Sequence, residues 1–361
     1  MTSLADALPL RHGPALPNRL ALAPLTNTQS HLDGTLSDDE IGWLTARARG
    51  GFGLVVTAAA YVQRSGLAWA GQLGVSDDAH LPGLTRLADS LRANGAVSVV
   101  QLHHGGLRAN AEASGEQPVA PFADERSGAR ALTTGEVEQL VADFASAAAR
   151  CERAGFDGVQ VHGAHGYVLG QFLDVARNTR TDRYGGDAAG RARIMHEGVD
   201  AIRTATGPHF QVGLRLSPER WGIDRAEAVA LAGDLLTGRE LDHLDLSMWQ
   251  VGKTPEDDPT RDRPLVDDYL DLPRHGTALA LTGGVRNAAD AQSVLDRGAD
   301  IVCVGRAAVA DHAFAARTLD DPAHPGPTFP VTPDQLRAEC VGEAFVDYFT
   351  AGWPDLVATP A

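Results

Sequence analysis

The amino-acid sequence predicts a closed (β/α)8 barrel, an α/β fold in which a ring of parallel strands is surrounded by helices. Three observations lead to this prediction. Eight short apolar runs recur along the chain, amphipathic segments with helix-capping signals separate them, and polar or glycine-rich motifs follow the ends of several runs. A doubly wound open sheet shows the same local alternation, but the count of eight and the position of the polar motifs favour the closed barrel.

The length and composition fit one such domain. The chain has 361 residues, 43% of them hydrophobic and 22% charged, which suffices for a large buried core. Strand and helix alternate without a long break that would mark a second domain. We therefore expect a single domain over residues 1–361, with the barrel at about 17–317 and a C-terminal extension at 318–361.

Charge and cysteine usage exclude several classes of function. The formal net charge of −16 argues against nucleic acid and anionic membranes as partners, because both require a basic protein face. Cys151, Cys303 and Cys340 are widely spaced, so neither a disulfide framework nor a zinc knuckle is indicated. No apolar stretch approaches the roughly 20 residues of a membrane span, and no secretion signal is apparent at the N-terminus. We expect a cytoplasmic protein.

The eight apolar runs are too short for helices and suit strands that are buried on both faces. They cover residues 20–25, 53–57, 97–102, 158–162, 211–216, 243–247, 278–282 and 301–304. Helix signals lie between them. Ser37 with Glu40 forms one predicted capping box and Thr133 with Glu136 another, and a further helix begins near Asn287.

Two connections are unusually long. Residues 103–132 follow the third strand without a clear helix, and residues 248–273, rich in Asp, Pro and Arg, follow the sixth. Because both leave the C-terminal ends of strands, which form the active face of a barrel, we expect them to be lids or binding loops. Beyond the last strand we expect one helix, near 334–351, that packs outside the barrel.

Glycines follow the last two strands. Strand seven ends in Gly283-Gly284 and strand eight in Gly305-Arg306. Barrels often bind phosphate at these two loops, where backbone N–H groups face the anion and glycine permits their close approach. Arg306 would add a charged donor. The alternative is that these glycines only make tight turns, but their occurrence after both strands favours a phosphate site.

The fourth strand delivers His162-Gly-Ala-His165-Gly-Tyr167 to the active face. A zinc site lacks the HExxH spacing and a third ligand, a Ser–His–Asp triad lacks a GxSxG elbow, and histidines that only satisfy backbone groups are a further alternative. We favour a pair of imidazole donors that bind a carbonyl oxygen, with Tyr167 as proton source. Such a set suits reduction of an enone, because hydride addition builds negative charge on the oxygen while a phenol keeps its proton at neutral pH.

These motifs resemble the old yellow enzyme (NADH:flavin oxidoreductase) family over about residues 17–316. The most specific stretch is HGAHGYVLGQFL, which begins at His162, followed by NTRTDRYGG from Asn178. APLT at 23–26, QL before HGG at 101–106, GLRLSP around Arg215 and the two glycine motifs match in the family's order. Together they make the resemblance specific.

The resemblance implies FMN as cofactor, NADH or NADPH as reductant and a small electron-poor alkene as substrate. The implied FMN contacts are Ala23, Pro24, Leu25 and Thr26 along the ring, Ala59 and Gln101 at its pyrimidine side, Arg215 near N1, and Gly283, Gly284, Gly305 and Arg306 at the phosphate. The implied substrate contacts are His162, His165, Tyr167 and His103, with Tyr167 as proton donor. His103 stands where the family usually has an apolar or aromatic residue, and Thr26 where one branch has cysteine.

Other functions stay open from the residues alone. A flavoprotein of the same fold could reduce quinones or nitro compounds, and a flavin-free barrel lyase or isomerase could bind a phosphorylated metabolite. A non-catalytic flavin-binding or partner-binding protein is a third alternative. No metal is expected, and no GxGxxG follows a strand to mark a separate nicotinamide site. We expect a homo-oligomer.

Overall fold

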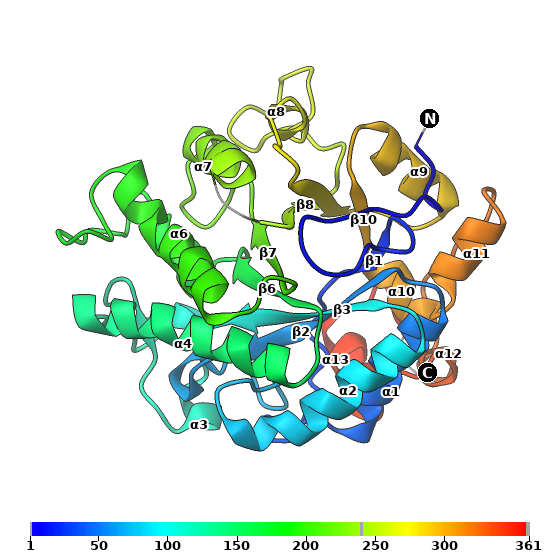
Figure 1. Ribbon diagram of the computed structural model, residues 1–361, viewed down its shortest axis with the longest axis horizontal. Helices are drawn as coiled ribbons and strands as arrows, with labels where there is room; N and C mark the ends of the chain where they lie inside the picture. The colour runs from blue at the N-terminus through cyan, green and yellow to red at the C-terminus, as the bar shows by residue number, and fades with distance from the viewer. Residues whose placement is uncertain (1, 239–240, 359–361) are drawn as a thin grey trace.

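The computed structural model describes residues 2–238 and 241–358 and contains a closed barrel of eight strands (Figure 1). Around the ring, neighbouring strands are parallel, and β1 closes it against β10. The strands are β1 (Leu20–Leu22), β2 (Leu54–Tyr61), β3 (Val97–His103), β6 (Gly158–Gly163), β7 (Gln211–Leu216), β8 (His243–Trp249), β9 (Ala278–Gly283) and β10 (Ile301–Val304). Each overlaps one predicted run, so the predicted (β/α)8 barrel is confirmed.

Both faces of the strands are buried, as the continuous apolar runs predict. In β1, Leu20 and Leu22 point outward into the layer between strands and helices, whereas Ala21 and, just beyond the strand, Ala23 belong to a smaller cluster inside the ring. This division follows from the two-residue period of a strand. Burial of both faces explains why the runs carry almost no polar alternation.

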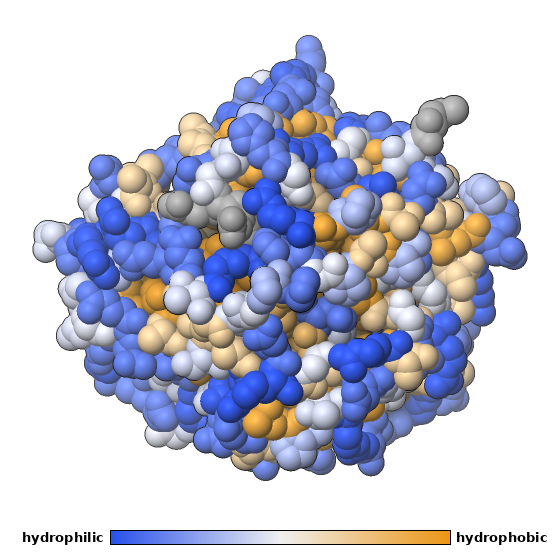
Figure 2. Space-filling model, in the orientation of Figure 1, coloured by the Kyte–Doolittle hydropathy of each residue, from blue (hydrophilic) through white to orange (hydrophobic). Residues whose placement is uncertain are grey.

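The N-terminal segment closes one end of the barrel. Leu8 and Leu16 pair in an antiparallel bridge, and the fully buried Leu16 packs into the cluster inside the ring. In Figure 1 this blue segment crosses in front of the strands. Figure 2 shows the same face as a mixture of hydrophilic residues and small hydrophobic patches. The C-terminal ends of the strands therefore form the end at which side chains can meet a ligand.

Helices surround the ring: α1 (Asp38–Arg49), α2 (Leu81–Ala93), α4 (Thr134–Arg153), α6 (Ala188–Ala205), α7 (Arg225–Gly238), α9 (Ala288–Asp296), α10 (Arg306–Ala310) and α11 (Phe314–Asp320). The capping box of Thr133 and Glu136 is confirmed, and Asn287 caps α9. The box predicted at Ser37 is only half formed. Ser37 accepts from the Glu40 N–H, but the Glu40 carboxylate is buried and accepts from Asn27 at 3.0 Å instead. Among the described helices, none has the length and apolar character needed to cross a bilayer.

The two long connections contain structure of their own. Residues 103–132 include η3 (Gly106–Arg108), α3 (Ala111–Ser114) and a small ribbon of β4 (Val119–Ala120) with β5 (Arg130–Ala131). The connection after β8 includes α8 (Asp267–Leu270) and is held by ion pairs. Asp268 accepts from Arg225 of α7 at 2.9 Å and from Arg261. Both connections lie at the C-terminal ends of the strands.

The chain after the barrel forms two helices where one was expected, α12 (Pro333–Ala338) and α13 (Glu343–Gly352). Cys340 adopts a left-handed conformation with φ 58°, which reverses the chain between them. Phe345 of α13 packs edge-on against Trp43 of α1, with ring centroids 5.0 Å apart. As predicted, α13 lies outside the strand ring, and Figure 1 shows it behind the barrel, opposite the N-terminal segment.

Candidate active site

Two adjoining cavities open at the C-terminal ends of the strands, with volumes of about 180 and 220 Å³. Pro24, Leu25, His165, Arg215 and Arg306 line both. The first cavity also contains predicted site residues from β2, β3 and β6, namely Ala59, Gln101, His162 and Tyr167, together with Thr26. The second contains Ala23, Gly283, Gly284 and Gly305. Fourteen of the fifteen predicted residues therefore gather at one place, as the conserved geometry of barrel strand ends requires.

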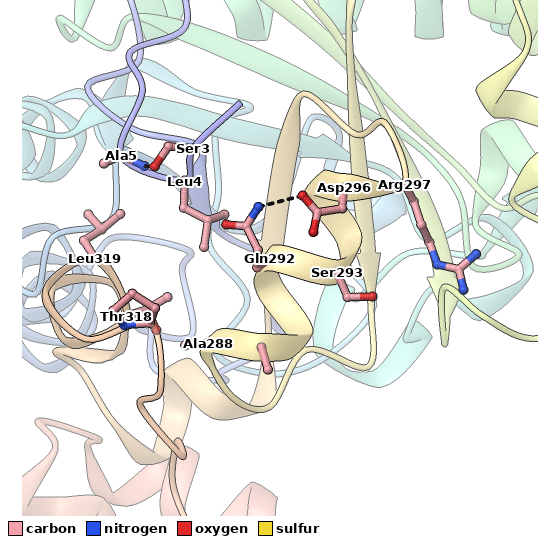
Figure 3. A pocket seen from close by; sticks show the side chains of 12 residues that line it. Ser3, Leu4, Ala5, Ala288, Gln292, Ser293, Asp296, Arg297, Thr318 and Leu319 are labelled. Atoms are coloured by element: carbon pink, nitrogen blue, oxygen red, sulfur yellow. Dashed lines mark hydrogen bonds between the residues drawn. The ribbon is translucent and has the colours of Figure 1, made fainter. Parts of the chain in front are cut away.

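Larger hollows lie on the outside of the barrel and contain none of these residues. One of about 630 Å³ lies between the N-terminal segment, α9 and α11 (Figure 3). There Gln292 donates to Asp296 at 2.8 Å. The other residues that line this hollow are a mixture of polar and apolar side chains. Its walls carry no imidazole or phenol, so it offers no acid–base chemistry comparable with that of the barrel mouth.

The second cavity has the donors that a phosphate requires. Gly284 has a φ of 81°, a conformation that favours glycine. The N–H groups of Gly284, Gly305 and Arg306 donate to no acceptor among the described residues. The half-buried Arg306 guanidinium likewise has no carboxylate partner there, and its pKa is lowered by burial and then by Arg286. Unpaired donors and a partly desolvated cation fit the phosphate group of FMN.

Polar side chains from β7, β8 and β9 form a buried layer under the cavities. Arg215 is 4% exposed, and its Nε lies 3.0 Å from Oδ2 of the fully buried Asp245. Asp245 also accepts from the Thr282 hydroxyl at 2.7 Å. Arg215 Nη2 donates to Ser247 at 3.2 Å. The guanidinium is thus fixed at the cavity floor, where a cation would stabilise the negative charge that a reduced flavin carries near N1.

The two predicted imidazoles stand at right angles, with ring centroids 5.1 Å apart. The Ala164 N–H donates to Nδ1 of His162 at 3.4 Å, which places the ring proton on Nε2. His165 has a left-handed backbone, φ 61°, and its Nε2 lies 2.7 Å from the Ser247 hydroxyl. Burial holds the pKa of both rings well below the usual value, and nearby basic groups add to this. Both imidazoles are therefore neutral.

Tyr167 completes this wall of the first cavity. Its ring centroid lies 5.2 Å from that of His162. The guanidinium of Arg108 lies over the phenol ring at 4.7 Å and is held there by a 2.8 Å bond to the His165 carbonyl. The Tyr167 hydroxyl has no hydrogen-bond partner among residues 2–238 and 241–358. Burial raises the pKa of this phenol, while Arg108 opposes the shift. A protonated hydroxyl thus faces the cavity.

His103 does not line either cavity, contrary to the expectation that it joins the substrate pocket. It is fully buried, and the Tyr167 ring lies against it with centroids 4.3 Å apart. The alternation of β3 points Gln101 and His103 to the same side, but Tyr167 covers the second of them. His103 therefore lies directly behind the pocket wall.

Several lining residues were not found from the sequence. Aromatic side chains cover the first cavity: Trp69 from the connection after β2, and Tyr348, Phe349 and Trp353 from the C-terminal segment. An aromatic cluster near the C-terminus was a usable signal, but its place depends on how α13 packs. Asp245 was also missed, although a carboxylate inside an apolar run is a strong signal. Among the described residues, no group of three or more His, Cys, Asp or Glu side chains could hold a metal ion.

Comparisons with known proteins agree with this geometry. The NADH:flavin oxidoreductase / NADH oxidase family matches residues 9–321. The chain is 37% identical over 321 residues to the probable NADH-dependent flavin oxidoreductase YqiG of Bacillus subtilis (strain 168), covering 85% of each protein. It is 34% identical over 323 residues to the NADH:fumarate oxidoreductase of Klebsiella pneumoniae (strain 342), covering 85% of this chain but 35% of that protein.

Solved structures show the same barrel. The structure of morphinone reductase in complex with tetrahydroNAD superposes with a TM-score of 0.79 at 29% identity, covering 96% of this chain and 97% of that one. The old yellow enzyme homologue from Zymomonas mobilis gives the same TM-score at 25% identity, covering 96% and 99%. The chain therefore belongs to the NADH:flavin oxidoreductase / NADH oxidase family, the old yellow enzymes, and is an oxidoreductase that uses FMN with NADH or NADPH.

Proposed function

We propose that the protein is an ene-reductase, which reduces the activated C=C bond of α,β-unsaturated carbonyl compounds. The observation that carries this proposal is that two neutral imidazoles and a protonated phenol line one cavity together with the buried Arg215. Two relatives are named for fumarate and acrylate, which both carry a C=C bond conjugated to a carboxyl carbon. Morphinone reductase is a further structural relative.

In this proposal FMN is bound by residues of both cavities. The N–H groups beyond β9 and β10, with Arg306, would hold the phosphate. The ring-contact set is Ala23, Pro24, Leu25, Thr26, Ala59, Gln101 and Arg215, all of which line the cavities. NADH or NADPH and the alkene would occupy the first cavity in turn, since no second nucleotide motif is present in the sequence.

When bound and reduced, FMN supplies hydride to the β-carbon of the alkene. The side chains do the rest. His162 donates its Nε2–H to the substrate carbonyl oxygen, where negative charge builds up. Arg215 already donates to the Ser247 oxygen, so the Ser247 hydroxyl can donate to His165 Nε2 and leave the His165 proton on Nδ1 as a second donor. Tyr167 then delivers its hydroxyl proton to the α-carbon, which completes the saturated product.

The shifted pKa values suit these roles. Because the pKa of each imidazole is lowered by burial, both rings stay neutral donors across the physiological range. Burial raises the pKa of the Tyr167 phenol, so it stays protonated until the charge on the substrate attracts the proton. A carboxylic acid at this place would lack its proton at neutral pH unless its own pKa were strongly raised.

The variant Tyr167→Phe tests the proton-donor role. We expect the oxidative half-reaction with an enone to slow by about 100-fold or more, the usual contribution of a general acid. Reduction of bound FMN by NADH or NADPH should keep its rate, because that step needs no proton from Tyr167. Tyr348→Phe is the matched control, since Tyr348 lines the same cavity. An unchanged oxidative rate in Tyr167→Phe with flavin retained would refute the role.

The reaction class is tested with three acceptors. Stopped-flow reoxidation of the reduced enzyme by an enone, a quinone and a nitro ester compares the proposed substrate with its alternatives. We expect His162→Ala to slow the enone more than the nitro ester, because negative charge builds up on the carbonyl oxygen of the enone and the nitro ester has no such carbonyl. Equal losses with all three would contradict the proposal.

We further propose that residues 1–361 form one domain. The position of the C-terminal aromatic residues in the cavity supports this proposal.

A further inference from the structure

A chain of hydrogen bonds fixes the proton of His103. The Oε1 atom of Gln72 accepts from the Ala68 N–H at 2.7 Å, so the Gln72 amide has a defined orientation. Its Nε2 then donates to the Ala59 carbonyl at 2.9 Å and to His103 Nδ1 at 3.0 Å. Because Nδ1 accepts, the single proton of a neutral His103 ring is on Nε2.

The Nε2–H of His103 is buried and has no conventional acceptor. The His103 ring is fully buried, and its Nε2 is without a partner among residues 2–238 and 241–358. Burial holds the pKa of this ring well below the usual value, so it stays neutral. A buried donor without an acceptor is costly unless a weaker acceptor lies in its path. The electron-rich face of an aromatic ring is such an acceptor.

The nearest ring is that of Tyr167. It lies 4.3 Å from the His103 ring, centroid to centroid, at 79°, an edge-to-face arrangement. The other aromatic neighbours, Trp69 and His162, are both 5.6 Å away and tilted. The guanidinium of Arg108 also lies over the Tyr167 ring, at 4.7 Å. The neutral His103 ring of β3 and the Arg108 cation of η3 therefore both contact the phenol ring.

We infer that His103 is a positioning residue for Tyr167: Gln72 selects the tautomer whose Nε2–H donates to the face of the phenol ring and thereby fixes the proton donor in its reactive orientation. This role rests on the proposed function of Tyr167. The bond also favours the phenolate over the phenol, as does Arg108, because the N–H dipole of neutral His103 and the Arg108 cation both direct positive potential at the ring. The charged or titratable groups around the phenol are His103, His162, Arg108 and Tyr348.

Nuclear magnetic resonance of the FMN-loaded enzyme tests the contact directly. Nitrogen-15 shifts distinguish a protonated ring nitrogen from an unprotonated one, and we expect His103 to carry its proton on Nε2. That proton should be shielded by the ring current of Tyr167, and the shielding should persist in Tyr167→Phe and disappear in Tyr167→Leu. A proton on Nδ1, or a shift that Tyr167→Leu leaves unchanged, would overturn the inference.

Two variants of His103 test the consequence for the reaction. The amide of Gln reaches the position of Nε2, whereas the amide of Asn reaches only that of Nδ1 and keeps the bond to Gln72. We expect His103→Asn to slow the oxidative half-reaction roughly two- to fivefold and His103→Gln to restore it. FMN reduction should keep its rate in both. Equal oxidative rates in the two variants would overturn the inference.

Together, the rate of Tyr167→Phe and the shielding of the His103 proton separate this inference from the proposed function. If Tyr167→Phe reacts at the wild-type rate, the proton-donor role of Tyr167 fails. The shielding of the His103 proton in the unmodified enzyme would still show whether the contact exists. The shift measurement needs no change at His103, so it decides the contact even where a His103 variant does not fold.

Discussion

The buried pair of Arg215 and Asp245 allows a quantitative prediction. Asp245 is fully buried, lies 3.0 Å from Arg215 and accepts from Thr282. In Asp245→Asn the carboxylate charge is lost while the guanidinium stays in place. Removal of one member of a buried ion pair costs about 3–5 kcal/mol, because the remaining charge is left without compensation. We therefore expect the flavin-free protein to lose about that much free energy of unfolding.

The shift in melting temperature follows from the chain length. Unfolding entropy is about 2.1 cal/mol/K per residue, so the 361 residues give about 0.76 kcal/mol/K. A loss of about 3–5 kcal/mol then lowers Tm by roughly 4–7 °C. Thr282→Val is the matched control, since it removes only the hydroxyl donor to Asp245 and should cost about 1 kcal/mol.

Equilibrium denaturation of four proteins measures the coupling: wild type, Asp245→Asn, Arg215→Met and the double variant. We expect the double variant to be more stable than Asp245→Asn, because the uncompensated charge has been removed as well. The reasoning is refuted if Asp245→Asn costs no more than Thr282→Val, or if the two single effects simply add. Either result would mean that Arg215 is well solvated where the structure shows it buried.

Three further predictions concern the cofactor, the pH dependence and the aromatic cover of the cavities. Arg306→Met should weaken FMN binding about 10- to 100-fold, as loss of hydrogen bonds to a charged group does, and Arg286→Met much less; quenching of flavin fluorescence by flavin-free protein measures both. Burial lowers the pKa of His104 to about 4. As the pH falls from about 6.5, the imidazole is therefore protonated in the unfolded chain before it is in the folded one, and the free energy of unfolding decreases. His104→Asn should reduce that loss by about 2 kcal/mol at pH 5, measured by urea denaturation at pH 7.5 and 5. Trp353→Ala should widen both cavities and raise kcat/KM for a bulky enone relative to a small one; an unchanged ratio counts against its role as a wall.

The barrel and most of its polar residues were predictable because strand ends in this fold have fixed positions. A run such as 158–162 ends at the active face in any closed parallel barrel, so His162 had to lie at the same end of the barrel as Gly283 whatever the helices do. The positions of the glycine motifs after β9 and β10, and of the wall formed by His162, His165 and Tyr167, followed from the same rule. The extension of β2 to Tyr61 brings Ala59 to the cavity, with an irregular register between Val56 and Ala59.

What could not be predicted depends on contacts between distant segments. The aromatic cover of the cavity requires α13 to lie over the mouth, and this follows from Phe345 packing on Trp43, near the other end of the chain. Likewise, strand alternation places His103 toward the pocket, but only the position of the Tyr167 ring shows that it lies behind the wall. Homo-oligomer formation and a cytoplasmic location stay predictions.

The charge arrangement explains how an acidic protein binds an anionic cofactor. The net charge is −16, yet Arg306 has no carboxylate within 4.0 Å among the described residues. Arg215 does have one, but that carboxylate, Asp245, is fully buried. Burying a cation without a partner costs stability, and that cost is recovered only when an anion arrives. Within the described part of the chain, the barrel mouth therefore presents backbone N–H groups and a guanidinium that have no acceptor until an anion binds. Binding of a phosphate there should raise the stability of the whole fold, because an anion that binds only the folded state shifts the equilibrium toward it.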